Sequence, residues 1–216
     1  MHVLITGAGR GIGKALQDHY TGSGARVTGT SRRPGDGKLV TMDVADAASV
    51  QAVADSLAGQ ALDLLICNAG VYFDKGQSLE HGYPVQMWAD SFATNVTGVF
   101  LTVQAFLPHL RRAGAGKIAI ISSQMGSDTR APGGSYIYRA SKAAALNLGR
   151  NLATDLKPEG ISVGIYHPGW VRTDMGGTTA EISVTQSATG LAARFAALGP
   201  ANTGCFETWD GRAHPY

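Results

Sequence analysis

A tyrosine and a lysine four positions apart, Tyr138 and Lys142, are the side chains whose types and spacing best suit chemistry. Apolar residues follow them at helical spacing as far as Leu156, so we expect the pair on one helix face, one turn apart. A free phenol has a pKa of about 10, and a neighbouring ammonium lowers it by favouring the phenolate. Such a tyrosine could exchange a proton with an alcohol oxygen. The same spacing also occurs on ordinary surface helices. Tyr136 is a rival acid/base, but it lies off the face of Lys142.

A glycine-rich stretch, Thr6-Gly7-Ala8-Gly9-Arg10-Gly11-Ile12-Gly13, lies between an expected strand at 3–6 and an expected helix. A strand, a glycine turn and a helix form the context of a dinucleotide-binding fingerprint. Glycines let the backbone approach a pyrophosphate, and free amides at the helix start favour its negative charge. The small-residue turn Asn68–Gly70 could let a cofactor ring lie against the backbone. A purely structural role remains the alternative for both turns.

The strand expected at 26–30 ends at Ser31, Arg32 and Arg33, with no acidic residue to bind ribose hydroxyls. Because arginines suit a 2′-phosphate, the sequence predicts NADP(H) rather than NAD(H) as the cofactor. Arg10 in the glycine loop could add a second positive contact. The alternative is that Arg32 and Arg33 are simply solvated.

Strand and helix patterns alternate along the chain, which predicts an α/β fold: a single-domain, Rossmann-type, doubly wound parallel sheet over residues 1–216. Strands are expected at 3–6, 26–30, 38–42, 62–67, 117–121, 161–166 and 204–207. A long helix is expected from Pro84, with Trp88, Phe92, Val96, Val99 and Val103 at core spacing. Ser183–Gln186 resembles a capping box that opens the last helix. The connection at 34–37 is too short for a crossover helix.

The composition, with 216 residues, 44% hydrophobic and 16% charged, is that of an ordinary globular protein. The net charge of +2 is thinly spread, so we expect neither nucleic-acid nor membrane binding. No apolar run reaches the length of a membrane span, and no leader segment is evident before residue 3. Two cysteines, Cys67 and Cys205, are too few for a disulfide framework, and a cytoplasmic location is expected. No histidines pair at metal-ligand spacing, so no metal is expected.

These motifs together resemble the short-chain dehydrogenase/reductase family from end to end. The resemblance rests on the glycine loop, Asn68-Ala69-Gly70, Asn95, Ser123, Tyr138-x-x-x-Lys142 and Pro168-Gly169, in this order. The phrase His167-Pro-Gly-Trp-Val-Arg-Thr-Asp-Met-Gly-Gly177 is most similar to the short C-factor-like and carbonyl-reductase-like members.

The resemblance implies a role for each matching residue. Tyr138 would be the acid/base, while Lys142 lowers its pKa and holds the nicotinamide ribose. Ser123 would bind the substrate oxygen and is preferred to Ser122 because Gly126 follows it by three positions. Asn95 would order a water that links Lys142 to solvent. The expected cofactor contacts are Thr6, Gly7, Gly9, Arg10, Gly11, Ile12, Gly13, Ser31, Arg32, Asp43, Val44, Asn68, Ala69, Gly70, Tyr138, Lys142, Pro168, Gly169, Val171 and Thr173.

The expected activity is NADP(H)-dependent interconversion of alcohols with medium-sized apolar or aromatic aldehydes and ketones. Candidate pocket residues are Tyr72, Phe73, Tyr83, Trp88 and Trp170, although the helical spacing of Trp88 favours a place in the core. The segment after Thr173 is short for a substrate lid, which predicts an open pocket with loose selection. The family leads us to expect a homodimer or homotetramer. The alternative function is an NAD(P)-binding regulatory or signalling protein that acts through a partner.

Overall fold

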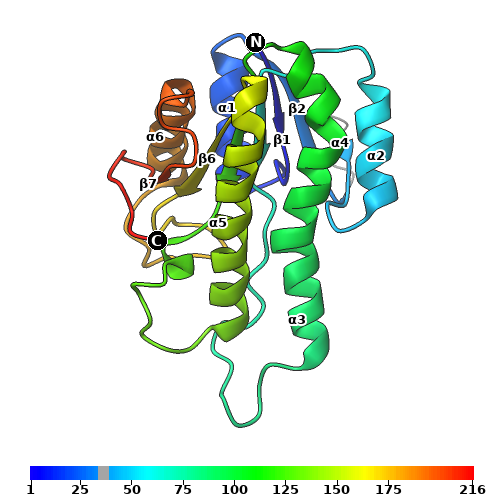
Figure 1. The fold of residues 1–216 in the computed structure, drawn as a ribbon. Coiled ribbons are helices and arrows are strands. Elements are labelled where there is room, and N and C mark those ends of the chain that lie inside the picture. Colours follow the sequence, from blue (N-terminus) through cyan, green and yellow to red (C-terminus); the bar gives the residue numbers. More distant parts are fainter. Residues whose placement is uncertain (34–38) are drawn as a thin grey trace.

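A seven-stranded sheet organises the computed structural model, which describes residues 1–33 and 39–216 (Figure 1). The strands are β1 (His2–Ile5), β2 (Arg26–Ser31), β3 (Val40–Thr41), β4 (Leu64–Cys67), β5 (Lys117–Ile121), β6 (Ser162–His167) and β7 (Phe206–Thr208). They lie in the order β3-β2-β1-β4-β5-β6-β7, and every neighbouring pair is parallel. The predicted Rossmann-type, doubly wound parallel sheet is therefore confirmed.

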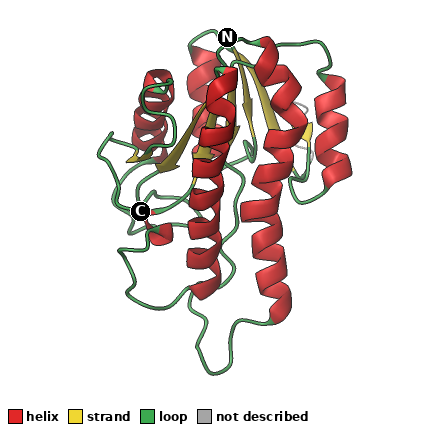
Figure 2. Cartoon of the chain, viewed as in Figure 1, coloured by secondary structure: helices red, strands yellow, loops and turns green. Residues whose placement is uncertain are grey.

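Helices cover both faces of this sheet (Figure 2). They are α1 (Gly11–Gly22), α2 (Ala47–Ser56), α3 (Val85–Phe92), α4 (Gly98–Arg112), α5 (Tyr136–Leu156) and α6 (Val184–Ala197). Short 3₁₀ turns, η2 (Gln124–Gly126) and η3 (Lys157–Glu159), follow β5 and α5. The predicted capping box is present at the start of α6. Ser183 Oγ accepts from the amide of Gln186, and the Gln186 side chain accepts from the amide of Ser183.

Two apolar layers hold the helices to the sheet. On one face, Val50 of α2, Phe106 of α4 and Leu156 of α5 belong to the same buried cluster as Leu4 and Leu65 of the strands. On the other face, α1 and α6 contribute Leu16, Leu191 and Phe195 to a cluster with Val3 and Ile5. β1, β4 and β6 are buried along their whole length, so they show no alternation of buried and exposed residues, and β4 is a continuous apolar run.

Several predicted strand boundaries were wrong by one or two residues. The fourth strand starts at Leu64 rather than residue 62, because the amide of Leu62 bonds to the carbonyl of His109 in α4 instead of to a strand. The third strand is limited to Val40–Thr41, while Lys38 and the short connection at 34–37 lie outside the described residues. The strands predicted at 161–166 and 204–207 are shifted to Ser162–His167 and Phe206–Thr208.

The long helix predicted from Pro84 is interrupted. A π-helical segment, η1 (Ala93–Thr97), separates α3 from α4. Val99 and Val103 are buried as expected, but Trp88 is 36% exposed and does not belong to the core. The reason is visible in Figure 1, where α3 projects beyond the ends of the strands. Within the described ranges, we find no helix with the length and apolar character needed to cross a membrane.

Candidate active site

A cavity of about 1130 Å³ opens at the carboxyl ends of the central strands. It lies where the strand order reverses between β1 and β4, the position at which open parallel sheets bind ligands. Among the residues expected to contact the cofactor, those that line it are Gly7, Gly9, Arg10, Gly11, Ile12, Gly13, Ser31, Arg32, Val44, Asn68, Ala69, Gly70, Tyr138, Lys142, Pro168 and Thr173. Residues from distant parts of the sequence therefore line one continuous cavity.

The glycine loop has a shape that larger residues would block. Gly7 and Gly11 have φ angles of +68° and +55°, which L side chains rarely adopt. A Cβ atom added to Gly13 would collide with the carbonyl oxygen of Gly7 and the side chain of Asn68. The loop runs directly into α1, whose first turn lines the cavity. This narrow turn at a helix start fits the pyrophosphate of a dinucleotide.

Thr6 supports the site from behind rather than lining it. Its hydroxyl oxygen accepts hydrogen bonds from the amides of Asn68 (3.0 Å) and Ala69 (2.9 Å), and Asn68 Nδ2 donates to the Thr6 carbonyl at 2.9 Å. These bonds tie the end of β1 to the turn after β4. The spacing of the glycine loop and the Asn68–Gly70 turn is therefore fixed on both sides of the cavity.

The end of the cavity beside β2 is basic. Ser31, Arg32 and Arg33 all line it, and both arginines are exposed. Arg10 also lines it, but its guanidinium is paired with Asp174 from the segment after β6.

Four residues expected at the cofactor, Thr6, Asp43, Gly169 and Val171, are not among the residues that line the cavity. The carboxylate of Asp43 accepts from the amide of Ala45, and Val171 is almost fully buried.

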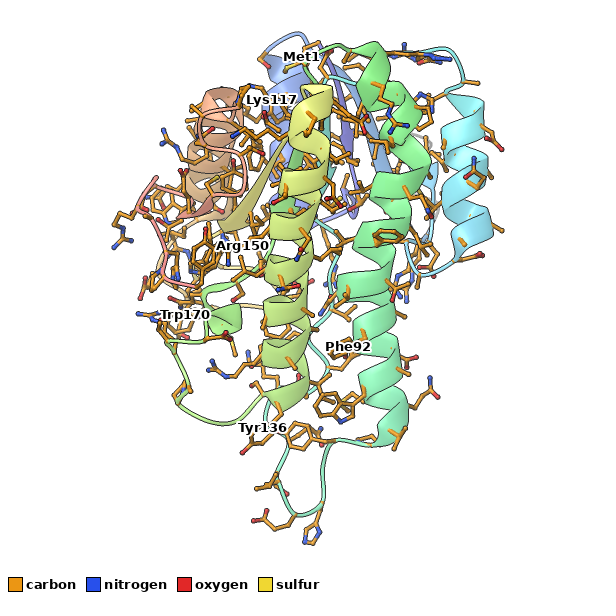
Figure 3. All side chains as sticks on the ribbon, in the orientation of Figure 1. Met1, Phe92, Lys117, Tyr136, Arg150 and Trp170 are labelled. Atoms are coloured by element: carbon orange, nitrogen blue, oxygen red, sulfur yellow. The ribbon has the colours of Figure 1, made fainter. Side chains whose placement is uncertain are left out.

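Tyr138 and Lys142 lie together on α5, with Lys142 Nζ 5.6 Å from the centroid of the Tyr138 ring. Both are buried, with 8% and 5% of their surfaces exposed. Lys142 Nζ donates to the carbonyl oxygen of Ile121 at 3.0 Å, at the end of β5. Tyr136 lies elsewhere: it is 40% exposed and packs edge-on against Tyr83. Figure 3 shows it at the end of α5 that projects beyond the sheet.

Burial dominates the protonation of both groups. It raises the pKa of Tyr138 to about 12, with Tyr72 and Asp74 adding to the rise and a hydrogen bond with Ser123 opposing it. Burial also lowers the pKa of Lys142 to about 8. The expectation that Lys142 holds the pKa of Tyr138 below its usual value was therefore wrong for this structure. The cost of burying a phenolate exceeds the attraction of an ammonium that lies more than 5 Å from the ring centre.

Asn95 lies in the π-helical segment and is 1% exposed. Its Oδ1 accepts from the amide of Val71 at 2.8 Å, and its Nδ2 donates to the Val71 carbonyl at 2.9 Å and to Ser141 Oγ at 3.0 Å. A side-chain amide with these partners joins the loop after β4 to α5. A π turn at such a place is a common feature of functional sites.

The two serines after β5 have different partners. Ser122 lines the cavity, but its hydroxyl donates to the main-chain oxygen of Lys142 at 2.9 Å. Ser123 does not line it, yet it is the serine whose side chain acts on Tyr138, lowering the pKa of the phenol. Its Oγ also accepts from the amide of Met125 at 3.1 Å. The hydroxyl beside the phenol is therefore that of Ser123.

The five aromatic candidates for the substrate pocket, Tyr72, Phe73, Tyr83, Trp88 and Trp170, are absent from the described lining of the cavity. Tyr72 nevertheless stacks on Tyr138, with ring centroids 4.2 Å apart. Phe73 and Trp170 are each 45% exposed, and Met175 contributes an apolar side chain to the cavity wall.

Sequence reasoning missed one buried acid. Asp74 is completely buried, and its carboxylate accepts hydrogen bonds from the amides of Ile137 and Tyr138 at the start of α5. The loop at 71–83 shows no periodicity, so nothing in the local pattern placed it near α5. One feature of the sequence could have indicated it: Asp74 directly follows three apolar or aromatic residues, Val71, Tyr72 and Phe73. An acid that is buried with such neighbours needs hydrogen-bond or charge partners elsewhere in the fold.

The fold and the cavity thus define a dinucleotide-binding α/β protein with a buried tyrosine–lysine pair. The family model for short chain dehydrogenase matches residues 1–182, and the chain belongs to this family.

Three relatives show the range of its similarity. The chain is 36% identical over 169 residues to the C-signal protein of Myxococcus xanthus, covering 77% of this chain and 100% of that protein. It is 31% identical over 185 residues to a 3-oxoacyl-acyl-carrier-protein reductase of Escherichia coli (strain K12), covering 80% of this chain and 74% of the relative. Among solved structures, NADPH-bound carbonyl reductase from chicken fatty liver superposes with a TM-score of 0.91 and 31% identity, covering 100% of this chain and 98% of the other. The chain is therefore an oxidoreductase-family protein close to carbonyl-reductase-like members.

Proposed function

We propose that this protein is an NADP(H)-dependent oxidoreductase that interconverts alcohols with medium-sized apolar or aromatic aldehydes and ketones. The observation that carries this proposal is the buried Tyr138–Lys142 pair on the wall of a cavity that is shaped for a dinucleotide. The place of the Ser123 side chain beside Tyr138, where it lowers the pKa of the phenol, supports it, because these two hydroxyls could meet the same substrate oxygen.

In this proposal each residue has one task. When bound, the nicotinamide supplies or accepts the hydride. Tyr138 donates its phenolic proton to the carbonyl oxygen during reduction and takes it back during oxidation. Ser123 donates a hydrogen bond to the same oxygen and so stabilises the charge that develops there.

Lys142 holds the nicotinamide ribose and carries protons toward Tyr138. A lysine with a pKa of about 8 can gain and lose a proton near neutral pH, which suits this role. Asn95 would order a water that links Lys142 to solvent. A Cβ atom built on Gly70 would lie 3.3 Å from Asn95 Oδ1 and 3.4 Å from Lys142 Nζ, so the two side chains approach the same small space.

The preference for NADP(H) is supported by Arg32 and Arg33 at the end of β2, where a 2′-phosphate would lie. Arg10 would add a further positive contact once its guanidinium turns from Asp174 toward the phosphate. The NADPH-bound state of the chicken carbonyl reductase supports the same choice.

The breadth of substrate selection is proposed from the segment after Thr173. This segment is short, and the exposed side chains of Trp170 and Met175 offer apolar surface beside the cavity. An open, apolar entrance would accept medium-sized carbonyls without selecting strongly among them.

A second candidate function is that of an NAD(P)-binding regulatory or signalling protein. It is favoured by one observation, the 36% identity to a protein named C-signal. Carbonyl turnover separates the two candidates, because a pure sensor needs cofactor binding but no acid/base group.

The remaining properties are proposals that follow from the family and from the chain itself. We expect residues 1–216 to act as one catalytic domain, as a homodimer or homotetramer, with a small-molecule substrate. A cytoplasmic location is supported by two free thiols, Cys67 and Cys205.

The test is a titration of the purified protein with NADPH and with NADH, followed by a panel of aldehydes and ketones. The proposal expects tighter NADPH binding and carbonyl-dependent NADPH oxidation. Binding without turnover across a broad panel would favour the regulatory function. Absence of binding of either cofactor would overturn both.

A further inference from the structure

The carboxylate of Asp74 is buried against the start of α5. The side chain has no exposed surface. Its Oδ2 accepts from the amide of Ile137 at 2.9 Å, and its two oxygens lie 3.2 and 3.3 Å from the amide nitrogen of Tyr138. Tyr138 is thus held through its own backbone by a residue 64 positions earlier in the chain.

The start of α5 needs such a partner. The first amides of a helix have no carbonyl within the helix to bond, and the residue before the helix normally caps them. That residue, Ser135, has a φ of +49°, and its hydroxyl bonds to the Tyr72 hydroxyl at 2.5 Å. The carbonyl oxygen of Ser135 accepts from the amide of Arg139, which is the first bond of the regular helical ladder. The amides of Ile137 and Tyr138, which precede it, donate to Asp74 instead.

A cap from a distant segment fixes the position of a helix end relative to that segment, which a cap from the adjoining residue does not do. Asp46, for comparison, caps α2 from the adjoining position by accepting from the amide of Ala48 at 2.9 Å. A local cap of this kind stabilises a helix end but does not fix where that end lies. Asp74 belongs to the loop that follows Asn68–Gly70, the turn that lines the cavity. Its bonds therefore tie the position of Tyr138 to the wall that faces the cofactor.

We propose that Asp74 is a positioning residue that sets the place of Tyr138 in the site by capping α5 from the loop after β4. The expected effect on catalysis rests on the proposed function. The capping of α5 does not, because it can be measured without turnover.

The charge of Asp74 has a second consequence. The titratable groups that face Tyr138 are Tyr72 and Asp74 from the loop after β4 and Lys142 from α5. Asp74 and Tyr72 both raise the pKa of Tyr138. Asparagine at position 74 keeps an oxygen that accepts from the amides but removes the negative charge, so it separates the two effects.

The experiment compares Asp74→Ala, Asp74→Asn and Asp46→Ala in the full chain. Hydrogen–deuterium exchange of residues 136–140 reports capping, NADPH titration reports cofactor affinity, and steady-state rates with an accepted aldehyde separate kcat from KM. We expect Asp74→Ala to speed exchange in the first turn of α5 by about tenfold, because losing a cap has an effect of that size. We expect it to lower kcat by about tenfold or more through misplacement of the phenol, with NADPH affinity within a few-fold of wild type.

The other two variants make the result specific. Asp74→Asn should restore kcat to within a few-fold of wild type. Because it lowers the pKa of Tyr138, which acts as the base in oxidation, it should also move the rise of the oxidation rate with pH to lower pH. Asp46→Ala removes a cap of the same chemistry from α2 and should leave kcat and exchange at 136–140 unchanged.

Unchanged exchange at 136–140 in Asp74→Ala would overturn the capping, and equal kcat losses in Asp74→Ala and Asp46→Ala would overturn the positioning role. If the wild type itself turns over no carbonyl, the proposed function fails, while the exchange data still decide whether Asp74 holds the start of α5.

Discussion

Tyr72 lies nearly flat against Tyr138, with ring centroids 4.2 Å apart and planes inclined by 21°. The Tyr72 hydroxyl is fixed by Ser135 at 2.5 Å, so the covering ring cannot swing away without breaking that bond. One face of the Tyr138 ring is therefore closed to water. This cover contributes to the burial that raises the pKa of Tyr138 to about 12. A phenol kept protonated in this way is suited to donate a proton.

Replacing Tyr138 with phenylalanine tests this donor directly. The ring and its stack on Tyr72 are retained, but the proton is lost, so kcat should fall by about 10²-fold or more. NADPH affinity should stay within a few-fold of wild type, as measured by fluorescence titration. Tyr136→Phe is the matched control, since Tyr136 is exposed and packs on Tyr83 instead. Loss of turnover in Tyr136→Phe with an active Tyr138→Phe would reverse the assignment of the acid/base.

Arg32→Ala tests the cofactor preference. If Arg32 binds the 2′-phosphate, the variant should lose about tenfold or more in NADPH affinity, the size expected for a charged hydrogen bond. NADH, which lacks that phosphate, should bind almost as it does to wild type. Parallel titrations with both cofactors give the answer. Equal losses for NADPH and NADH would remove the argument for a 2′-phosphate site.

Lys142→Met tests the buried ammonium through stability. Burial lowers the pKa of Lys142 from its usual 10.5 to about 8, so between these values the unfolded chain binds more protons than the folded one. Stability from this group therefore rises with pH across that window. From pH 7.5 to pH 9 the wild type should gain about 1 kcal/mol relative to Lys142→Met. Urea unfolding of both proteins at the two pH values measures the difference. A constant difference would mean that Lys142 titrates at its usual pH in the folded protein.

Gly13→Ala tests the shape of the glycine loop. The added methyl group would collide with the Gly7 carbonyl and the Asn68 side chain. We expect a loss of about 1–3 kcal/mol in unfolding free energy, typical of overpacking, together with weaker NADPH binding. Gly22→Ala is the control in the same helix, because a methyl group there meets open space. It should leave stability equal or slightly higher. Calorimetry and cofactor titration of both variants would decide, and similar behaviour of the two would contradict the steric argument.

Much of the fold could be predicted because its signals are local or follow one general rule. The capping box at Ser183 and the strand at Lys117–Ile121 depend on adjacent residues and appear as expected. The gathering of the glycine loop, Asn68–Gly70 and Tyr138 around one cavity follows from the rule that parallel strands bring their carboxyl ends to one edge.

What the sequence did not reveal depends on contacts between distant segments. The carboxylate of Asp74 accepts a hydrogen bond from the amide of Ile137, 63 positions later in the chain, and no pattern in the loop that carries Asp74 predicts this bond. The pKa of Tyr138 depends on how completely Tyr72 and its surroundings exclude water, which spacing on a helix does not tell. Trp88 has the right spacing for the core but lies on a part of α3 with no strand beside it.

The π turn at Ala93–Thr97 has a consequence for the length of this stretch of chain. Successive residues of an α-helix are about 100° apart around the axis, and a π turn accommodates one additional residue. In an uninterrupted helix Trp88 and Val99 would point the same way, yet they are 36% and 6% exposed. Deleting a single residue between 93 and 97 would leave these two residues ten positions apart, about 80° out of phase in a regular α-helix, which is the offset that the π turn already gives them. The segments on either side would keep their relative orientation, but the π turn that carries Asn95 would be lost. The additional residue therefore has a local effect: it leaves the directions of α3 and α4 as an unbroken helix one residue shorter would have them, and it sets the place of Asn95 beside Val71.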